Sequence, residues 1–127
     1  MLFNKVAILG IGLIGSSLAR NIKENKDANF IAIYDKNKKN LETASSLNLG
    51  DIYTSNLNQA VTDADIIIFA TPVCSFEELA EKTALYAKKG AIITDVGSVK
   101  QYTLEKIEQH LNQTTGHIVV GGHPIAG

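Results

Sequence analysis

Residues 6–19 read VAILGIGLIGSSLA, an apolar run that passes into three closely spaced glycines and then an amphipathic stretch. Val6–Leu9 is short, continuous and apolar, which is typical of a strand buried on both faces of a sheet. Leu13–Lys23 has the spacing of a helix. A G-x-G-x-x-G pattern that follows a buried strand and opens a helix is typical of loops that bind the pyrophosphate of a dinucleotide. The stretch therefore predicts a strand, a glycine loop and a helix in direct succession.

The three glycines have separate steric roles in such a loop. Gly10 permits the tight turn, Gly12 lets a pyrophosphate approach the backbone because it has no Cβ, and Gly15 lets the helix pack closely on the strand. The helix N-terminus then presents free N–H groups and a partial positive charge to the phosphates. The candidate cofactor-binding residues of this loop are Gly10, Gly12, Leu13, Ile14 and Gly15. A glycine turn that binds no ligand is the alternative.

The rest of the chain alternates strand-like and helix-like segments. Apolar runs predict strands at residues 6–9, 30–34, 52–53, 66–70, 91–94 and 118–120. Helical spacing predicts helices at residues 13–23, 37–47, 57–61, 76–87 and 99–111. This alternation predicts an α/β fold with a doubly wound, mostly parallel sheet, the Rossmann fold. With 127 residues the chain is long enough for one such dinucleotide-binding domain, residues 1–127.

Asp35 is the candidate residue for binding a ribose of the cofactor. It ends the second predicted strand, 20 residues after Gly15, where dinucleotide-binding folds carry a ribose-binding carboxylate. That carboxylate accepts hydrogen bonds from the ribose hydroxyls of NAD and repels the 2′-phosphate of NADP, so NAD is the expected cofactor and NADP the less favoured one. Lys36, Lys38 and Lys39 leave an alternative open, because lysines can hold that phosphate. Their ordinary interpretation is a solvated helix face.

Three later loops follow predicted strands and should lie at the same edge of the sheet as the glycine loop. Ala70, Thr71 and Pro72 are expected to lie over the cofactor, although a plain strand-ending turn fits the same residues. Ser98 is placed either to cap the following helix or to put its hydroxyl beside the nicotinamide or the substrate. His123 follows the last predicted strand and is a candidate proton acceptor near neutral pH.

Composition excludes several classes of protein. Hydrophobic residues make up 45% of the chain and charged residues 20%, with 12 Lys plus Arg against 13 Asp plus Glu. This balance argues against nucleic-acid or membrane binding driven by bulk charge. The longest nearly apolar run, Val6–Ile14, is far shorter than the roughly 20 residues of a membrane helix. The single cysteine, Cys74, permits neither an intrachain disulfide nor a cysteine-based metal site. We therefore expect no metal, nucleic-acid or membrane partner and a cytoplasmic location.

The distinctive stretches occur in a characteristic order. The chain contains GIGLIGSS at residues 10–17, Asp35 after a strand, ATPV at 70–73, DVGSVK at 95–100 and GGHPIAG at 121–127. Together they resemble the prephenate dehydrogenase family, which includes arogenate and cyclohexadienyl dehydrogenases. Many dehydrogenases share the glycine loop, whereas DVGSVK followed by HPIAG is much narrower. The resemblance covers the whole chain.

This resemblance implies an oxidoreductase of tyrosine biosynthesis that oxidises and decarboxylates prephenate to 4-hydroxyphenylpyruvate, or arogenate to tyrosine. It implies that His123 binds the ring hydroxyl and accepts its proton while hydride leaves the same carbon for the nicotinamide. It also implies that Ser98 orients His123 and contacts the ring hydroxyl or the nicotinamide. His123 and Ser98 are therefore the candidate catalytic residues.

The resemblance further implies a second, helical domain after residue 127, which completes the substrate pocket, forms a homodimer and supplies an arginine for a substrate carboxylate. The single arginine of this chain, Arg20, lies on the first predicted helix, where it is placed for the surface. We therefore expect this chain to bind NAD as the cofactor half of the enzyme and to turn over substrate negligibly by itself. His110 and His117 are expected to be surface or packing residues.

Two other interpretations stay open. One is another dehydrogenase with a Rossmann domain and a helical second domain, of the 3-hydroxy acid, 6-phosphogluconate or pyrroline-carboxylate reductase type. These types are not expected to carry His123 within HPIAG. The other is a non-catalytic NAD-binding regulatory module, which needs residues 10–15 and Asp35 but neither Ser98 nor His123.

Overall fold

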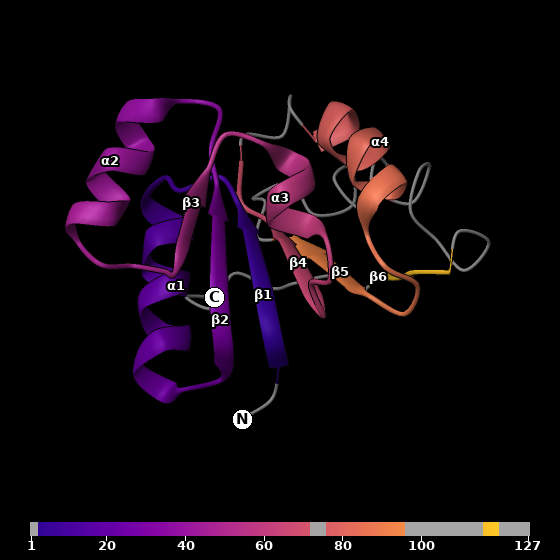
Figure 1. Ribbon diagram of the computed structural model, residues 1–127, viewed down its shortest axis with the longest axis horizontal. Coiled ribbons are helices and arrows are strands. Elements are labelled where there is room, and N and C mark those ends of the chain that lie inside the picture. Colours follow the sequence, from indigo (N-terminus) through magenta and orange to yellow (C-terminus); the bar gives the residue numbers. More distant parts are fainter. Residues whose placement is uncertain (1–2, 72–75, 96–115, 120–127) are drawn as a thin grey trace.

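The computed structural model describes residues 3–71, 76–95 and 116–119. Its strands are β1 (Phe3–Leu9), β2 (Ala28–Tyr34), β3 (Ile52–Thr54), β4 (Ile66–Phe69), β5 (Ile92–Asp95) and β6 (Ile118–Val119). Its helices are α1 (Leu13–Asn25), α2 (Lys38–Ser46), α3 (Leu57–Val61) and α4 (Phe76–Tyr86). Strand and helix alternate from β1 to β5, as the sequence predicts (Figure 1).

The strands form one sheet in the order β3-β2-β1-β4-β5-β6, and every neighbouring pair is parallel. From β1 the chain builds outward to β3 on one side, then returns to the centre and builds from β4 to β6 on the other. This is the strand order of a Rossmann fold. The predicted doubly wound parallel sheet is therefore confirmed.

The register of the sheet brings the ends of the central strands to one level. Leu9 at the end of β1 pairs with Tyr34 of β2 on one side and with Phe69 of β4 on the other. Phe69 in turn pairs with Asp95 at the end of β5. The loops that follow these strands therefore emerge at one edge, the carboxyl edge, where ligands bind in open α/β sheets.

Two apolar layers cover the two faces of the sheet. Val6 and Ile8 of β1 belong to the layer that packs against α1 and α2, whereas Ala7 and Leu9 belong to the layer that packs against α3 and α4. Each of these four side chains is buried. Burial on both faces explains why the strand reads as a continuous apolar run rather than an alternating one.

β1 begins three residues earlier than the apolar run predicts. It starts at Phe3, and its extension is stabilised by a distant carboxylate. The N–H groups of Asn4 and Lys5 both donate to Oδ2 of Asp65, at 2.7 and 3.1 Å. Asn4 and Lys5 are polar and do not extend the apolar run, so the sequence predicted a strand that begins at Val6.

The end of α1 also differs from its prediction. The helix continues to Asn25 and ends at Lys26, which adopts the left-handed conformation with φ 54° although it is not glycine. The predicted helix at residues 99–111 and Val120 of the last predicted strand lie outside the described residues. In the part of the chain that the structure describes, no helix is both long enough and apolar enough to cross a membrane.

Candidate functional site

The turn after β1 is held by the two strands beside it. Gly10 has φ +102°, a conformation that residues with a side chain rarely adopt. Its N–H donates to the Tyr34 carbonyl oxygen at 2.7 Å, which ties the turn to the end of β2. A Cβ on Gly10 would lie 2.6 Å from Cγ2 of Thr71 in the loop after β4. The loops after β1 and β4 are therefore packed together, with no room for a side chain at residue 10.

Gly15 and Gly12 differ in the space around them. A Cβ on Gly15 would lie 2.2 Å from the Gly10 carbonyl oxygen, so α1 approaches the turn too closely for any side chain at this position. A Cβ on Gly12 would meet no other part of the protein within 4 Å. The tight turn at Gly10 and the close approach at Gly15 agree with the predicted steric roles. At Gly12 the structure leaves open space in front of the backbone.

The N-terminus of α1 borders this open space. Gly12 is the N-cap, and no side-chain hydrogen bond caps the helix there. Leu13 and Ile14 begin the helix with side chains that are 88% and 54% exposed. The Ser16 hydroxyl donates to the Ile11 carbonyl oxygen at 3.2 Å, which fastens the first turn of the helix to the loop. A helix start with uncapped N–H groups and a partial positive charge suits an anion.

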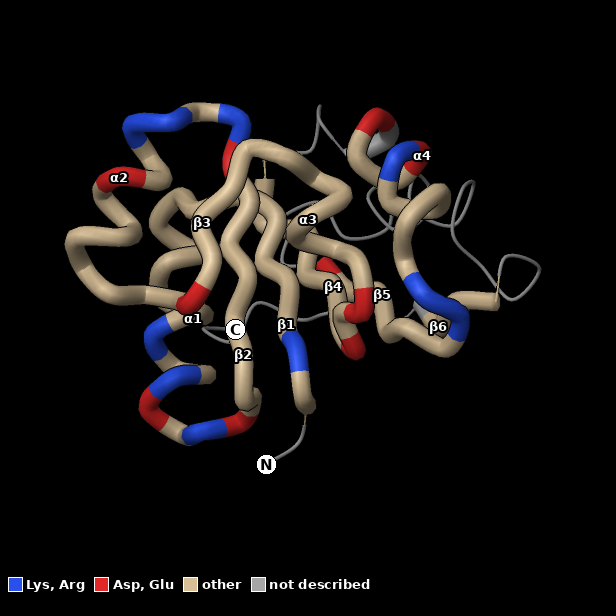
Figure 2. Tube along the Cα trace, viewed as in Figure 1, with Lys and Arg blue, Asp and Glu red and all other residues tan. Residues whose placement is uncertain are grey.

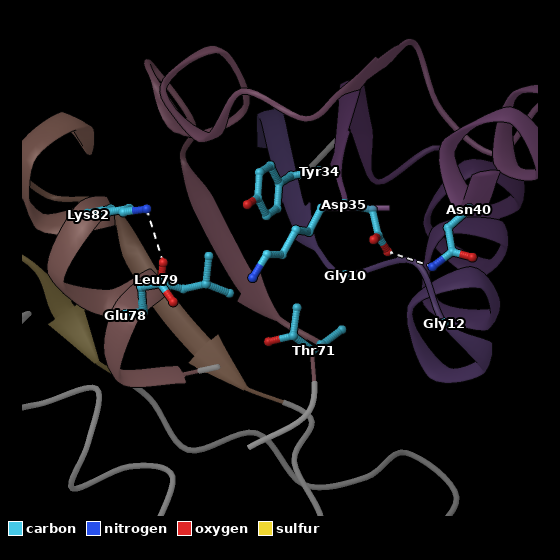
Figure 3. A pocket seen from close by; sticks show the side chains of 11 residues that line it. Gly10, Gly12, Tyr34, Asp35, Asn40, Thr71, Glu78, Leu79 and Lys82 are labelled. Atoms are coloured by element: carbon cyan, nitrogen blue, oxygen red, sulfur yellow. Dashed lines mark hydrogen bonds and ion pairs between the residues drawn. The ribbon is translucent and has the colours of Figure 1, made fainter. Parts of the chain in front are cut away.

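Asp35 follows β2 with both carboxylate oxygens bound by backbone N–H groups. Oδ2 accepts from the N–H of Ile11 in the glycine loop at 3.0 Å, and Oδ1 accepts from the N–H of Asn37 at 2.8 Å. The side-chain amide of Asn40 donates to Oδ2 at a longer 3.4 Å (Figure 3). The carboxylate is therefore oriented by the glycine loop and by the start of α2.

A cavity of about 410 Å³ lies at the carboxyl edge, between the ends of β1, β2 and β4 and helix α4. It is lined by Gly10, Gly12, Tyr34, Asp35, Lys36, Asn40, Ala70, Thr71, Glu78, Leu79 and Lys82. In Figure 3, Asp35 and Gly12 stand on one side of it and Glu78 and Lys82 on the other. Its volume is in the range of small-molecule sites.

Charged side chains of both signs surround the cavity. Figure 2 shows a basic segment at the start of α2 and both signs on α4, where Lys82 and Glu78 form an ion pair at 3.1 Å. The hydrogen bond from Lys82, with the positive charges of Lys82 and Lys36, holds the pKa of the Glu78 carboxyl below its usual value. The same hydrogen bond raises the pKa of Lys82. Burial raises the pKa of the Tyr34 hydroxyl, so this wall presents a neutral phenol beside charged groups.

The structure brings together part of the predicted cofactor-binding set. The members that line the cavity are Gly10, Gly12, Asp35, Ala70 and Thr71. The members that begin α1 beside it, without lining it, are Leu13, Ile14 and Gly15. Pro72, Ser98 and His123 lie outside the described residues.

Sequence reasoning missed Tyr34, Asn40, Glu78, Leu79 and Lys82 as lining residues. The last three lie on α4, which was predicted as a helix, but helical spacing does not say which side of a helix meets the loops at the carboxyl edge. The i, i+4 spacing of Glu78 and Lys82 is a signal for an ion pair rather than for a site. Tyr34 carries a signal that was available, because it is the last residue of a strand that ends at this edge.

Arg20 and His117, which sequence analysis set aside, do not line the cavity. Arg20 is exposed on α1. His117 is buried, with Nε2 3.3 Å from the Ala87 carbonyl oxygen, which makes it a packing residue as expected. His110 lies outside the described residues. Among the residues that the structure does describe, no group of three or more His, Cys, Asp or Glu side chains is placed to hold a metal ion.

The arrangement as a whole fits a bound dinucleotide. The open space at Gly12 and the uncapped start of α1 suit a pyrophosphate. Asp35 keeps acceptor capacity beyond the hydrogen bonds it already accepts, because a carboxylate offers about four lone-pair sites. The Thr71 hydroxyl beside the cavity is buried and has no hydrogen-bond partner within the described part of the chain.

Known proteins match this chain over nearly its full length. The family model "Prephenate dehydrogenase, nucleotide-binding domain" matches residues 18–127. A cyclohexadienyl dehydrogenase of Zymomonas mobilis is 38% identical over 125 residues, covering 98% of this chain and 42% of that protein. A prephenate dehydrogenase of Lactococcus lactis is 35% identical, covering 97% of this chain and 34% of that protein. This chain therefore spans less than half the length of these relatives.

A solved structure is similar over the same extent. Prephenate dehydrogenase from Aquifex aeolicus, in complex with hydroxyphenyl propionate and NAD+, superposes with a TM-score of 0.84 and 31% sequence identity. The match covers 98% of this chain and 42% of that one.

Proposed function

The chain belongs to the prephenate dehydrogenase family, as its nucleotide-binding domain, and on this premise we propose that it is the NAD-binding half of an enzyme that oxidatively decarboxylates prephenate to 4-hydroxyphenylpyruvate. Oxidation of arogenate to tyrosine is the alternative for the same machinery. The observation that supports the proposal most is the carboxyl edge itself, where open space at Gly12 lies beside an oriented Asp35. Family membership favours this reading over the other types of dehydrogenase considered above.

NAD rather than NADP is the cofactor in this proposal. The lone-pair site that remains free on the Asp35 carboxylate can accept a hydrogen bond from a ribose hydroxyl, whereas a 2′-phosphate at the same place would meet its negative charge. Lys36 lines the cavity as well, but its charge acts on Glu78 across the site.

The proposed chemistry divides between the cofactor and this chain. When bound, the nicotinamide supplies hydride acceptance. Following the family resemblance of DVGSVK and HPIAG, we assign acceptance of the ring-hydroxyl proton to His123 and the orientation of His123 to Ser98. Removing that proton makes the carbon a better hydride donor. The loss of CO2 with aromatisation of the ring then draws the reaction forward.

The whole enzyme, in this proposal, needs more than the present chain. A further helical portion would complete the substrate pocket, join two copies into a homodimer and supply an arginine whose planar fork grips a substrate carboxylate. Arg20 is unsuited to that task because it is exposed on α1, outside the cavity lining. The present chain by itself is then expected to bind NAD and to turn over prephenate negligibly, and the whole enzyme to act in the cytoplasm.

A thermal melt of the 127-residue chain with NAD or NADP tests the cofactor assignment. At a hundredfold excess over the dissociation constant, NAD should stabilise the folded chain by about 2.7 kcal/mol, and NADP by less at the same concentration. Nicotinamide mononucleotide, which lacks the adenosine half that Asp35 is proposed to bind, is the control and should shift the midpoint little. A larger shift with NADP, or none with either dinucleotide, would contradict the assignment.

The catalytic assignment needs the longer protein that contains this domain. There, His123→Asn should reduce prephenate-dependent reduction of NAD by on the order of a hundredfold or more, since a general base contributes about that much. NAD affinity should stay near the wild-type value. A small loss of turnover would count against His123 as proton acceptor, and a longer protein with no turnover of prephenate or arogenate would favour the regulatory module.

A further inference from the structure

Beyond its proposed contact with ribose, Asp35 makes a contact inside the protein that nothing in its proposed cofactor role requires. We propose that Asp35 is also the positioning residue of the glycine loop, holding residues 10–12 in their binding shape before any cofactor arrives. Its Oδ2 accepts the N–H of Ile11 at 3.0 Å, in the middle of the loop. The carboxylate thus connects the two sides of the site, the loop after β1 and the loop after β2.

The contact lies directly beyond the last hydrogen bond between β1 and β2. The N–H of Gly10 donates to the backbone carbonyl of Tyr34 at 2.7 Å, which is the last backbone bond between these strands. The next donor along the loop is Ile11, and the next residue along β2 is Asp35, whose side chain supplies the acceptor. The Ile11 side chain is buried in the layer that α1 and α2 cover, which holds this residue beside β2. Its N–H is part-buried, and such a backbone donor is stabilised by a partner.

The carboxylate is itself fixed from the other side. Oδ1 accepts the N–H of Asn37, two residues on, in the local turn that Asp and Asn side chains commonly form. Asn37 in turn caps α2, since its side chain accepts from the N–H of Lys39 at 2.8 Å. The start of α2, the Asp35 carboxylate and the glycine loop are therefore linked in one chain of hydrogen bonds. A charged acceptor strengthens such bonds.

The consequence concerns cofactor preference and rests on the proposed function. If Asp35 only repelled a 2′-phosphate, removing its charge would improve NADP binding. If Asp35 also shapes the loop that receives the pyrophosphate, the same substitution damages a contact that both cofactors use. Replacing Asp35 alone then weakens NAD binding without creating an NADP enzyme.

Asp35→Asn distinguishes the two roles because it affects the bonds to Asn37 and to Ile11 differently. The asparagine Oδ1 can keep the local turn with the N–H of Asn37, as asparagine commonly does. Its Nδ2 is a donor and cannot accept the N–H of Ile11. Asp51→Asn is the matched control, since Oδ2 of Asp51 likewise accepts a backbone N–H of this region, that of Ile31 in β2, at 2.8 Å and outside the cavity.

Amide hydrogen exchange of the cofactor-free chain is the first measurement. In the wild type, the Ile11 amide should exchange slowly although it lies in a loop. In Asp35→Asn it should exchange at least tenfold faster, while the Ile31 amide keeps its wild-type rate. In Asp51→Asn, whose Oδ1 can still accept the N–H of Ile31, the Ile11 amide should keep its wild-type rate. An unprotected Ile11 amide in the wild type overturns the proposal even if Asp35→Asn fails to fold. An Ile11 rate unchanged by Asp35→Asn overturns it as well.

Cofactor affinity of the same variants is the second measurement. Asp35→Asn should bind NAD at least tenfold more weakly than the wild type and NADP no more tightly. Asp51→Asn should match the wild type for both. A tenfold gain in NADP affinity for Asp35→Asn would overturn the positioning role. The exchange experiment uses no cofactor, so its result does not depend on the proposed function. It can contradict the positioning role while NAD binding is confirmed, and it can support the positioning role even if the chain binds no NAD.

Discussion

The carbonyl oxygen of Gly10 lies so close to Gly15 that a Cβ on residue 15 would stand 2.2 Å from it. The contact joins backbone to backbone, so neither partner can rotate away as a side chain would. It sets how near α1 comes to the turn after β1, and hence where the N-terminus of the helix points.

Gly15→Ala should therefore destabilise the chain before any ligand is considered. The added methyl group must displace either α1 or the turn, and overpacking of this kind costs about 1–3 kcal/mol. The measurement is the free energy of unfolding in denaturant without cofactor. A variant as stable as the wild type would show that α1 moves freely against the turn.

Gly12→Ala is the matched variant, and we expect it to change NAD affinity rather than stability. Its Cβ would meet no atom within 4 Å, and Gly12 has an ordinary φ of −69°, so the free energy of unfolding should change by less than about 0.5 kcal/mol. Because the methyl group enters the space proposed for the pyrophosphate, NAD affinity should fall on the order of tenfold, equivalent to about 1.4 kcal/mol. Isothermal titration with NAD checks this, and unchanged affinity would place the pyrophosphate elsewhere.

Asp65→Asn should weaken the opposite, amino edge of the sheet. There the Asp65 carboxylate accepts from the N–H groups of Asn4 and Lys5 and pairs with Lys88. Asparagine keeps one acceptor oxygen for these N–H groups but loses the negative charge and the pair with Lys88, so the variant should lose about 0.5–1 kcal/mol of stability at pH 7. NAD affinity should not change, because Asp65 lies outside the cavity lining.

The Asp65 contribution should also depend on pH. The hydrogen bond from Lys88, followed by that from the Lys5 amide, holds the pKa of Asp65 below its ordinary value of 3.8. A depressed pKa means stability that is present above about pH 4 and is lost as the pH falls through the folded-state value. Unfolding free energies of wild type and Asp65→Asn should therefore converge below about pH 4. Parallel curves in acid would contradict this origin.

Tyr34→Phe should change how the free energy of unfolding falls at alkaline pH. Burial raises the pKa of the Tyr34 hydroxyl above its ordinary 10.0, so the folded chain disfavours the phenolate. The associated stability is fully present below about pH 10 and is lost as the pH rises through the folded-state value. Between about pH 9 and about pH 11, where a free tyrosine ionises, the variant should lose stability less steeply than the wild type. Denaturant unfolding at both pH values tests this, and equal slopes would contradict it.

The parts of the fold that could be predicted are those in which burial directly restricts which residue types can occur. Val6–Leu9 and Ile66–Phe69 lie at the centre of the sheet with helices on both faces, so their residues are apolar in succession. Gly10 and Gly15 were assigned correct steric roles because a tight turn and a close helix–strand approach each permit one kind of residue. Asp35 was predicted to lie at the carboxyl edge from its position at the end of a strand, and it lines the cavity there.

The rest depends on contacts between residues far apart in the chain. The start of β1 depends on Asp65, which lies 60 residues beyond Lys5. The wall formed by Glu78 and Lys82 depends on how α4 is rotated about its axis. The bond between Ile11 and Asp35 depends on the register of two strands, which no local pattern records.

Two carboxylates hold the central strand at its two ends. Asp65 binds backbone N–H groups where β1 begins, and Asp35 binds one just after β1 ends. The two points are separated by roughly 20 Å of extended chain and share no partner. Changes at such separated sites combine additively as a rule. Substitutions around Asp65 can therefore be used to raise thermal stability, and substitutions around Asp35 to change cofactor preference. We expect neither set to cancel the effect of the other.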